Sequence, residues 1–569
     1  LCWGIASAWV RDYDPPHESR ARRPVAREAA MEDATVTAPG LVRAVGWLER
    51  QTIPVRRERH FGDRVTTCFA ERPETLHHML AAAMAEAGDA DALVGEEGRA
   101  SHAGTLARAA EIAGGLAALG VARGDRVAFL LGNRFAFVEA WLACLRLGAV
   151  AVPINPRWAP GEIAYACTHA GAKVLIHEAE LADRLPPEAE TPTLVRRLPV
   201  ADDAPLLAGH APGPETPGEE EDCAVILYTS GTTGRPKGAM LTHLNLVHSV
   251  LHFRYGMDVR AGDRTLLSVP ASHVTGLVAN IAALLSAGGA IVMQRAFKAR
   301  AFLELAERER ITHALMVPAM YNLCLREPDF ARFDLSAWRL GGYGGAPMPP
   351  ATIAALARTL PTLALQQAYG STETTSPATL IPPEETAAKP WSVGVPCHCA
   401  EIAVMDEAGR EVPPGAAGEL WIKGPMVVPG YWNDPEATAR EFVAGFWRSG
   451  DVGRMSADGH VAVLDRRKDM INRAGYKVYS VEVENALMRH ADVVEAACVG
   501  YPCEVLGERV RVHVVLREGV AREAAEAALA EHAARELADY KRPDAWVFED
   551  APLPRNPNGK VLKPELRAR

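Results

Sequence analysis

The segment Tyr228-Thr229-Ser230-Gly231-Thr232-Thr233-Gly234-Arg235-Pro236-Lys237-Gly238 is the most informative part of the chain. Its three glycines allow tight turns and a close approach of the backbone to a ligand. Four hydroxyls within five successive positions, together with Arg235 and Lys237, offer donors and positive charge to phosphate oxygens. The apolar run at 223–227 predicts a buried strand, and Thr242 suits the N-cap of a following helix. A loop of this kind after a buried strand indicates phosphate binding rather than a surface linker.

The segment does not match the common nucleotide loop GxxxxGK[ST], because Lys237 follows a proline and precedes a glycine. It resembles instead the signature loop of the adenylate-forming superfamily, which includes acyl-CoA synthetases, adenylation domains of peptide synthetases and luciferases. The resemblance implies that this loop binds ATP, through Thr229, Ser230, Gly231, Thr232, Thr233, Gly234 and Lys237.

Length and charge restrict the classes of protein that fit. A chain of 569 residues is too long for one core, so two or more domains are expected. The net charge of −10 argues against nucleic acid as the main partner. The longest apolar stretch, 277–293, is interrupted by Asn280, Ser286 and two glycines, so we expect no transmembrane segment.

The ten cysteines are scattered, which fits a reducing cytosol and predicts a cytoplasmic protein. Cys397-His398-Cys399 is the one group close enough to suggest a metal site. A structural loop is favoured there, because no second pair at zinc-finger spacing accompanies it. Residues 14–40 show no helical or strand periodicity, and residues 1–40 are expected to form a poorly ordered extension.

Helical and strand patterns alternate in the first half of the chain. We expect helices at 106–119 and 137–147 and strands at 126–131 and 150–153. This alternation predicts an α/β fold with layered helices and a largely parallel sheet. The pattern changes at 401–431 to short strands and turns, which indicates a small β element.

The last hundred or so residues form a unit of their own. Their pattern predicts an α+β arrangement, with helices at 481–488 and 523–539 and strands at 493–499 and 510–516. The resemblance covers residues 74–569 and implies a large N-terminal AMP-binding domain at 41–467. It also implies a small mobile C-terminal lid domain at 468–569, with its hinge near Lys468.

Further motifs follow the superfamily order. Gly344-Gly345-Ala346-Pro347 resembles the turn that binds adenine. Within Tyr369-Gly370-Ser371-Thr372-Glu373 the resemblance implies adenine packing by Tyr369, an α-phosphate contact by Thr372 and Mg²⁺ binding by Glu373.

Near the end of the chain the resemblance assigns the ribose and the catalytic lysine. Asp451 and Arg466 match the residues that contact ribose, and a carboxylate such as Asp451 can accept two hydrogen bonds at once. Lys560 matches the catalytic lysine. Gly475, Tyr476 and Lys477 match the segment that lines the CoA tunnel after the lid has rotated.

The acyl pocket is predicted around His273, Val274, Leu277 and Tyr343, where a histidine or aromatic residue gates the pocket in the superfamily. A hydrogen-bonded core histidine is the alternative for His273. These side chains offer no charged anchor, which favours a fatty or aromatic monocarboxylate as substrate.

Together these motifs imply an ATP-dependent acyl-CoA synthetase, an acid–thiol ligase. It would form an acyl-AMP with release of pyrophosphate and then transfer the acyl group to CoA, with Mg²⁺ at Glu373. The alternatives are a stand-alone acyl-AMP ligase or an adenylation protein that loads a separate carrier. A catalytically dead nucleotide-binding protein is disfavoured by the intact Glu373, Asp451, Arg466 and Lys560. A homodimer is left open.

Overall fold

The computed structural model describes residues 53–201, 205–229, 235–556 and 560–569. The predicted N-terminal extension at 1–40 lies outside the described residues, as do Ser230, Gly231, Thr232, Thr233 and Gly234 of the signature loop. Within the described part of the chain, no helix is both long enough and apolar enough to cross a membrane.

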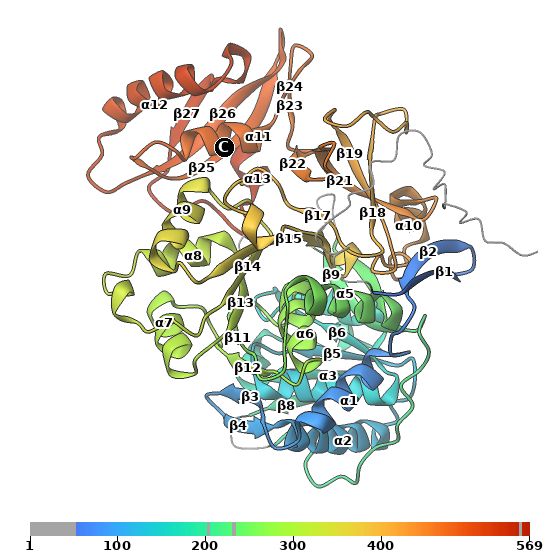
Figure 1. Ribbon diagram of the computed structural model, residues 1–569. Coiled ribbons are helices and arrows are strands. Elements are labelled where there is room, and N and C mark those ends of the chain that lie inside the picture. Colours follow the sequence, from blue (N-terminus) through green and yellow to red (C-terminus); the bar gives the residue numbers. More distant parts are fainter. Residues whose placement is uncertain (1–52, 202–204, 230–234, 557–559) are drawn as a thin grey trace, which may run out of the picture. The chain divides into compact units, whose positions relative to one another are not determined.

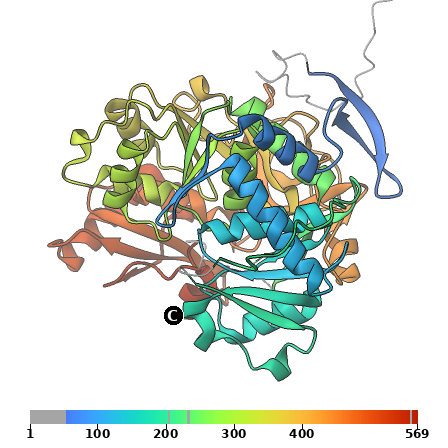
Figure 2. The same ribbon diagram turned by 90° about the horizontal axis from the view of Figure 1, so that it is seen from below.

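The first of the two large sheets has six strands in the order β10-β9-β6-β5-β7-β8. All neighbours are parallel except β10, which runs antiparallel to β9. The strands are β5 Arg126–Leu130, β6 Val150–Pro153, β7 Ala172–Glu178, β8 Arg196–Val200, β9 Cys223–Thr229 and β10 Lys237–Thr242. The helices along this part of the chain are α1 Leu76–Ala87, α2 His102–Ala118, α3 Phe135–Leu147 and α4 Pro160–Ala170. Figure 2 shows α1 and α2 side by side, and both pack on α3.

The predicted helices and strands at 106–153 are confirmed as α2, β5, α3 and β6. Strand β10 is a feature that the sequence did not predict. Its Lys237 pairs with Thr229 of β9, so the signature loop connects two neighbouring antiparallel strands. Helix α5, His243–Gly256, follows at once, and Thr242 caps it by accepting a hydrogen bond from the backbone N–H of Asn245, as predicted.

The second large sheet has nine strands in the order β17-β16-β15-β14-β13-β11-β12-β3-β4. Its centre, from β15 to β3, is parallel, and its two ends are antiparallel. The strands are β3 Asp91–Gly95, β4 Gly98–Ser101, β11 Arg264–Leu267, β12 Ala290–Met293, β13 His313–Met316, β14 Leu340–Gly344, β15 Ala364–Ser371, β16 Ser376–Leu380 and β17 Val395–Pro396.

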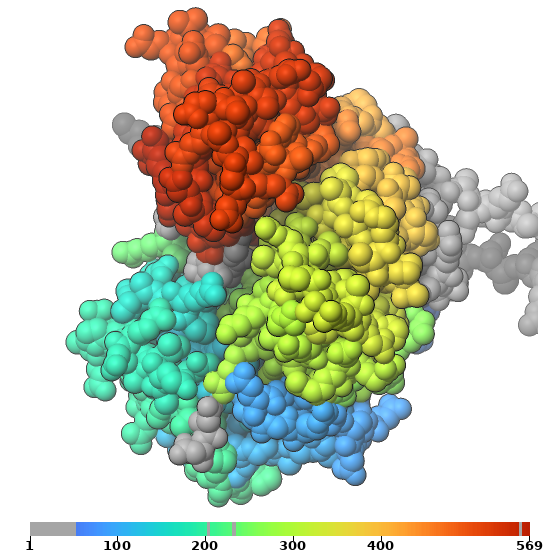
Figure 3. Space-filling model, turned by 90° about the vertical axis from the view of Figure 1, so that its left-hand side faces the viewer, coloured from blue at the N-terminus to red at the C-terminus, as the bar shows by residue number. Residues whose placement is uncertain are grey.

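Helices form layers against both large sheets. One buried cluster joins side chains of α3, α5 and the π-helix Thr275–Ala282 with apolar strand residues of both sheets. A second cluster places α7 (Ala299–Arg308), α8 (Pro318–Leu325) and α9 (Pro350–Thr359) on the other face of the nine-stranded sheet (Figure 1). The yellow-green surface of α7 and α8 is visible in Figure 3. Continuous apolar strands such as β12, buried along their whole length, suit a sheet covered on both faces.

Two smaller sheets complete the described structure, besides the hairpin of β1 (Val55–His60) and β2 (Arg64–Phe69). The small β element is confirmed as a five-stranded antiparallel sheet of β18 Glu401–Met405, β19 Gly418–Lys423, β20 Phe442–Val443, β21 Phe446–Met455 and β22 Val461–Arg466. Between β19 and β20 lies helix α10, Pro435–Glu441.

The C-terminal residues form another five-stranded sheet, with a buried cluster of its own. Its strands are β23 Ile471–Arg473, β24 Tyr476–Val478, β25 Val493–Cys503, β26 Gly507–Leu516 and β27 Ala545–Phe548, and its helices are α11 Ser480–Leu487, α12 Arg522–Glu536 and α13 Lys563–Arg567. The predicted α+β character of this part is confirmed. The domain boundaries at 40 and 467 stay predictions.

Candidate active site

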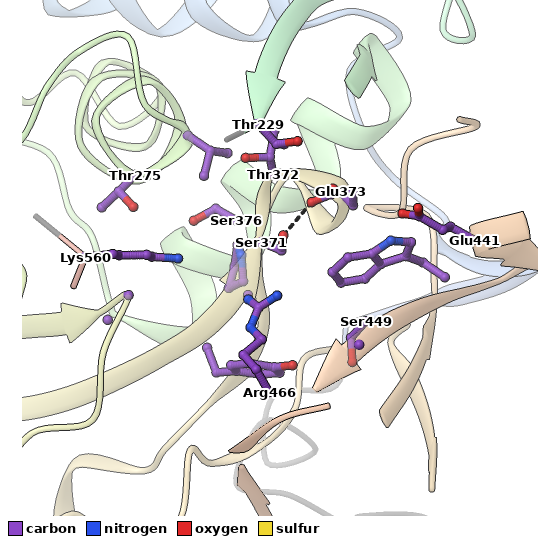
Figure 4. Close-up of a pocket in the computed structure, with 18 of the residues that line it drawn as sticks. Thr229, Thr275, Ser371, Thr372, Glu373, Ser376, Glu441, Ser449, Arg466 and Lys560 are labelled. Carbon is purple, nitrogen blue, oxygen red and sulfur yellow. Dashed lines mark hydrogen bonds between the residues drawn. The ribbon is translucent and has the colours of Figure 1, made fainter. Parts of the chain in front are cut away.

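A cavity of about 1030 Å³ lies where several strands end. Thr229 is the last residue of β9, Gly344 the last of β14 and Ser371 the last of β15. The carboxyl ends of parallel strands are the usual place for a ligand site in α/β folds. Figure 4 shows side chains from these strands facing the cavity together with Lys560 from the C-terminal part of the chain.

Most of the predicted site residues that the structure describes line this cavity, although more than 300 positions separate the first from the last. They are Thr229, Lys237, His273, Val274, Gly344, Gly345, Tyr369, Gly370, Thr372, Glu373, Arg466, Lys468 and Lys560. Because the sheets bring these distant motifs together, the cavity is the candidate active site.

Some predicted residues do not line the cavity. Leu277 is fully buried in the core, and Tyr343 packs against α7–α9 on the other face of its sheet. Successive strand residues point to opposite faces, so Tyr343 cannot share the direction of its neighbour Gly344. Ala346 and Pro347 lie in an exposed turn after Gly345. The acyl-pocket and adenine roles of these four residues stay predictions.

The segment predicted for the CoA tunnel also lies away from the cavity. Gly475 forms the turn between β23 and β24 with φ of 87°. The exposed ring of Tyr476 stacks on Tyr540 at 4.8 Å between centroids, and Lys477 pairs with Glu407 at 3.0 Å.

Asp451 and Arg466 meet because of strand register. They are direct partners across β21 and β22, and the Arg466 Nε lies 2.6 Å from Asp451 Oδ1. Tyr369 donates its hydroxyl hydrogen to Asp451 Oδ2 at 2.7 Å. Burial, and next the charge of Asp451, raises the pKa of Tyr369 well above its usual value, so the phenol stays neutral. Asp451 is buried and does not itself line the cavity, but its two partners, Tyr369 and Arg466, do.

Glu373 is a buried carboxylate, 6% exposed, in the short turn Thr372–Thr374 after β15. The hydroxyls of Ser371 and Tyr431 donate to its two oxygens, Tyr431 at 2.9 Å. The next residues, Thr375 and Ser376, have φ of 51° and 96°, which is a strained backbone for side chains of this type. Strain of this kind is typical of functional sites.

Gly370 is required by the same turn. A Cβ at this position would lie 1.5 Å from the carbonyl oxygen of Ser376, far inside van der Waals contact. Only a residue without a side chain therefore lets the strand end fold back beneath Glu373.

Positive charge gathers opposite Glu373. The Lys560 ammonium and the Arg466 guanidinium both point toward Ser371 and Ser376 in Figure 4. Lys560 is open to the cavity, but surrounding protein atoms displace much of its hydration. That desolvation, with the positive charge of Arg466 as a second cause, lowers the pKa of Lys560 below the ordinary lysine value.

His273 is a neutral imidazole on the cavity wall. Burial, assisted by the charge of Lys560, lowers the pKa of His273 to about 4. Its Nδ1 accepts a hydrogen bond from the Thr275 backbone N–H at 3.3 Å, so Nε2 carries the proton. A neutral donor beside Lys560 suits the binding of an anionic group.

Sequence reasoning missed several residues of the cavity. Glu441, which pairs with Lys237, and Glu419 of the small β sheet both line the cavity, and neither was predicted. Glu441 lies 204 positions from Lys237, and no motif spacing could have indicated that contact.

One group of metal-ligating side chains lies elsewhere in the described part of the chain, at Glu58, His60 and Cys68. Arg72 already occupies it, with Nη2 at 2.6 Å from Glu58 Oε2, and a guanidinium there repels a metal cation. Among the described residues, Cys397, His398 and Cys399 do not form such a group.

Comparisons with known proteins identify the family. Residues 80–432 match the AMP-binding enzyme family, and residues 482–560 match the AMP-binding enzyme C-terminal domain. The chain is 38% identical over 466 residues to a feruloyl-CoA synthase of an Amycolatopsis species, with 81% of this chain and 92% of the relative covered. It is 36% identical over 476 residues to the long-chain-fatty-acid–CoA ligase FadD13 of Mycobacterium tuberculosis, with 82% and 93% covered.

Solved structures give the same result. The crystal structure of ATP-bound MatB from Rhodopseudomonas palustris matches with a TM-score of 0.79 and 31% identity, covering 86% of this chain and 98% of that one. The predicted relationship is confirmed: the chain belongs to the AMP-binding enzymes of the adenylate-forming superfamily.

Proposed function

We propose that this protein is an AMP-forming acyl-CoA synthetase, and that it activates a fatty or aromatic monocarboxylate before transfer to CoA. The observation that carries the proposal is the cavity itself, which sets Lys560 and Arg466 opposite the buried Glu373. The relatives described above, a feruloyl-CoA synthase and a long-chain-fatty-acid–CoA ligase, support both the reaction class and the two types of acid.

The electrostatic problem of the first step explains this arrangement. An anionic carboxylate must attack the α-phosphate of a polyanion, and two like charges 4 Å apart repel by about 4 kcal/mol at an effective dielectric of 20. Cations fixed where charge accumulates lower that barrier more than a general base would. Lys560 would bridge the incoming carboxylate and the α-phosphate, and Thr372 would contact the same phosphate.

The cavity lining supports the remaining ATP contacts of this proposal. Tyr369 presents a ring to the cavity for adenine, with Gly344 and Gly345 as the close-packed turn beside it. Asp451 already accepts from Tyr369 and Arg466, but a carboxylate has about four acceptor positions and can still bind a ribose hydroxyl. Thr229 and Lys237 flank the signature loop that would hold the leaving pyrophosphate.

The residues present fit a magnesium ion at Glu373. Magnesium in nucleotide sites is usually held by one or two carboxylates together with substrate phosphates. Glu373 is such a carboxylate, and two hydroxyls orient it toward the cavity. When bound there, the ion would neutralise phosphate charge.

The second half-reaction requires a rearrangement in this proposal. Gly475, Tyr476 and Lys477 do not line the cavity in the present arrangement, in which Lys560 does. Rotation of the C-terminal lid about Lys468 would remove Lys560 and bring that turn to the CoA path. The hinge region contacts the C-terminal helix α13, because Arg567 pairs with Asp469 at 2.7 Å and donates to the Lys468 carbonyl.

The acid would enter on the His273 side of the cavity, where Val274, Leu315 and Pro377 are apolar and Thr275 and Ser376 offer hydroxyls. None of these side chains carries a charge that would bind a second carboxylate or an amino group. This supports a monocarboxylate over a dicarboxylate or an amino acid.

Pyrophosphate release across a panel of fatty, cinnamic and arylacetic acids, with and without CoA, tests the proposal. We expect ATP- and acid-dependent pyrophosphate release, and acyl-CoA formation when CoA is present. Acyl-AMP that accumulates and is not consumed by CoA would instead favour a ligase that loads a carrier protein. Absence of pyrophosphate release with every acid would contradict the proposal.

A further inference from the structure

A chain of four side chains connects the lysine beside the signature loop to the proposed magnesium ligand. Lys237 Nζ lies 2.8 and 2.6 Å from the two carboxylate oxygens of Glu441. Glu441 Oε2 lies 2.7 Å from the Tyr431 hydroxyl, which in turn lies 2.9 Å from Glu373 Oε1. Glu373 and Glu441 are both labelled in Figure 4.

The Tyr431 hydroxyl is within hydrogen-bond distance of two carboxylates but has a single hydrogen to donate. Tyr431 is 3% exposed, so water gives little help to the carboxylate that receives no hydrogen. Burial, and next the charge of Glu373, raises the pKa of Tyr431 far above its usual value, so it stays a neutral donor. Its hydrogen can therefore point to Glu373 or to Glu441, but not to both.

The surroundings decide which carboxylate receives the hydrogen. Without a nucleotide, Glu441 has donors from Lys237 and from Arg440, the latter at 3.0 Å. Glu441 is then satisfied, and the Tyr431 hydrogen is free to bond to Glu373. The Lys237 ammonium also lies 4.2 Å from the Tyr431 ring centroid, so these groups pack as one unit.

We infer that Tyr431 and Glu441 are positioning residues that form a hydrogen-bond switch, and that this switch couples the binding of ATP phosphate by Lys237 to the binding of a divalent cation by Glu373. The inference rests on the proposed use of ATP and Mg²⁺. When Lys237 turns to a phosphate, Glu441 loses its main cation and accepts the Tyr431 hydrogen. Glu373 Oε1 no longer accepts the Tyr431 hydrogen and is then available to the divalent cation.

The switch makes two predictions of tighter binding, which a mere loss of structure could not produce. In Tyr431→Phe the hydroxyl no longer competes for Glu373, so the nucleotide-free protein should bind Mn²⁺ more tightly than the wild type. In Glu441→Gln the ion pair that holds Lys237 is gone, so metal-free ATP should bind more tightly. We expect about a tenfold gain in each case, the size of one hydrogen bond to a charged group.

The experiment uses the full-length protein without acid substrate, so no turnover contributes. Mn²⁺ binding to the nucleotide-free protein is followed by electron paramagnetic resonance, and ATP binding in EDTA by calorimetry. Glu436→Gln is the matched control, because it makes the same charge change at the exposed start of α10 and should leave both affinities unchanged. A melting temperature for each variant confirms that it is folded.

The outcomes separate the inference from the proposed function. If the wild type binds ATP and Mn²⁺ but Tyr431→Phe binds Mn²⁺ equally or more weakly, the switch is wrong and the proposed function stands. An unchanged ATP affinity in Glu441→Gln also contradicts the switch. If the wild type binds neither ATP nor Mn²⁺, the proposed function fails and the switch fails with it.

Discussion

The cavity wall built by the large sheets and the wall supplied by the C-terminal residues hold their lysines in opposite ways. Lys237, at the start of β10, is paired with both oxygens of Glu441. The charges that act on Lys560 are those of Arg466, Asp451, Glu373 and Lys468, and in the described part of the chain neither carboxylate forms an ion pair with its ammonium.

The difference follows from what each wall must do. The sheets fix a site that is complete before the substrate arrives, so its charges are neutralised within the protein. The C-terminal wall brings a cation whose charge is only partly compensated, and desolvation keeps its pKa low. A lysine held in this way gains most when an anion arrives, which suits stabilisation of a transition state more than binding of the ground state.

The largest effect is expected from Lys560→Ala. Loss of this cation should reduce acyl-AMP formation by about a thousandfold, because a preorganised charge on the developing anion is removed. Transfer of the acyl group from chemically prepared acyl-AMP to CoA should change by less than about threefold. Pyrophosphate exchange and thioester formation measure the two halves separately.

Lys389→Ala is the control, since Lys389 lies outside the cavity and pairs with Asp458. An equal loss of both half-reactions in Lys560→Ala would mean that the C-terminal wall has no special role in the first step.

The wall built by the large sheets should be sensitive to a change in its backbone at Gly370. Gly370→Ala places a Cβ against the Ser376 carbonyl oxygen, and we expect a loss of about 3 kcal/mol in the free energy of unfolding. Chemical denaturation measures this loss. Gly409→Ala is the control, because nothing lies within 4 Å of a Cβ there, although φ of 73° adds some strain. Equal stability of the two variants would show that the turn beneath Glu373 is not rigid.

A third change tests the ribose side of the cavity. Asp451→Asn keeps the shape of the side chain but removes the charge that pairs with Arg466 and receives the Tyr369 hydrogen. We expect the KM for ATP to rise about tenfold, with a smaller change in kcat, because binding rather than chemistry is affected. Glu518→Gln, on an exposed turn outside the cavity lining, should leave KM unchanged. A fall in kcat without a change in KM would contradict the assignment.

The sequence predicted the layered α/β fold because its buried strands are continuous apolar runs and its helices end at glycines. It also predicted many of the cavity residues, such as Tyr369, Glu373 and Lys560, because their motifs resemble those of a known superfamily.

What the sequence could not predict depends on contacts between distant segments. Strand β10 is short and directly follows a polar loop, so its pairing with β9 was not visible from periodicity. The Lys237–Glu441 contact crosses 204 positions and has no motif. Tyr343 was assigned to the acyl pocket, but strand alternation turns it toward α7–α9, a direction that depends on which face of the sheet meets the cavity.

The smallest expected effect is a difference in pH dependence between the two half-reactions. Burial lowers the pKa of Lys560, so this group loses its charge at a lower pH than an ordinary lysine, for which the pKa is 10.5. Acyl-AMP formation needs the charged form and should decline on the alkaline side at a lower pH than thioester formation does. In Lys560→Arg the guanidinium stays charged, so the residual rate of acyl-AMP formation should lack this decline. The rates of both half-reactions, and the rate of the Lys560→Arg variant, could instead decline over the same alkaline pH range. In that case the titrating group belongs to the sheet wall or to a substrate. The distinction between the two walls would then not rest on the charge of Lys560.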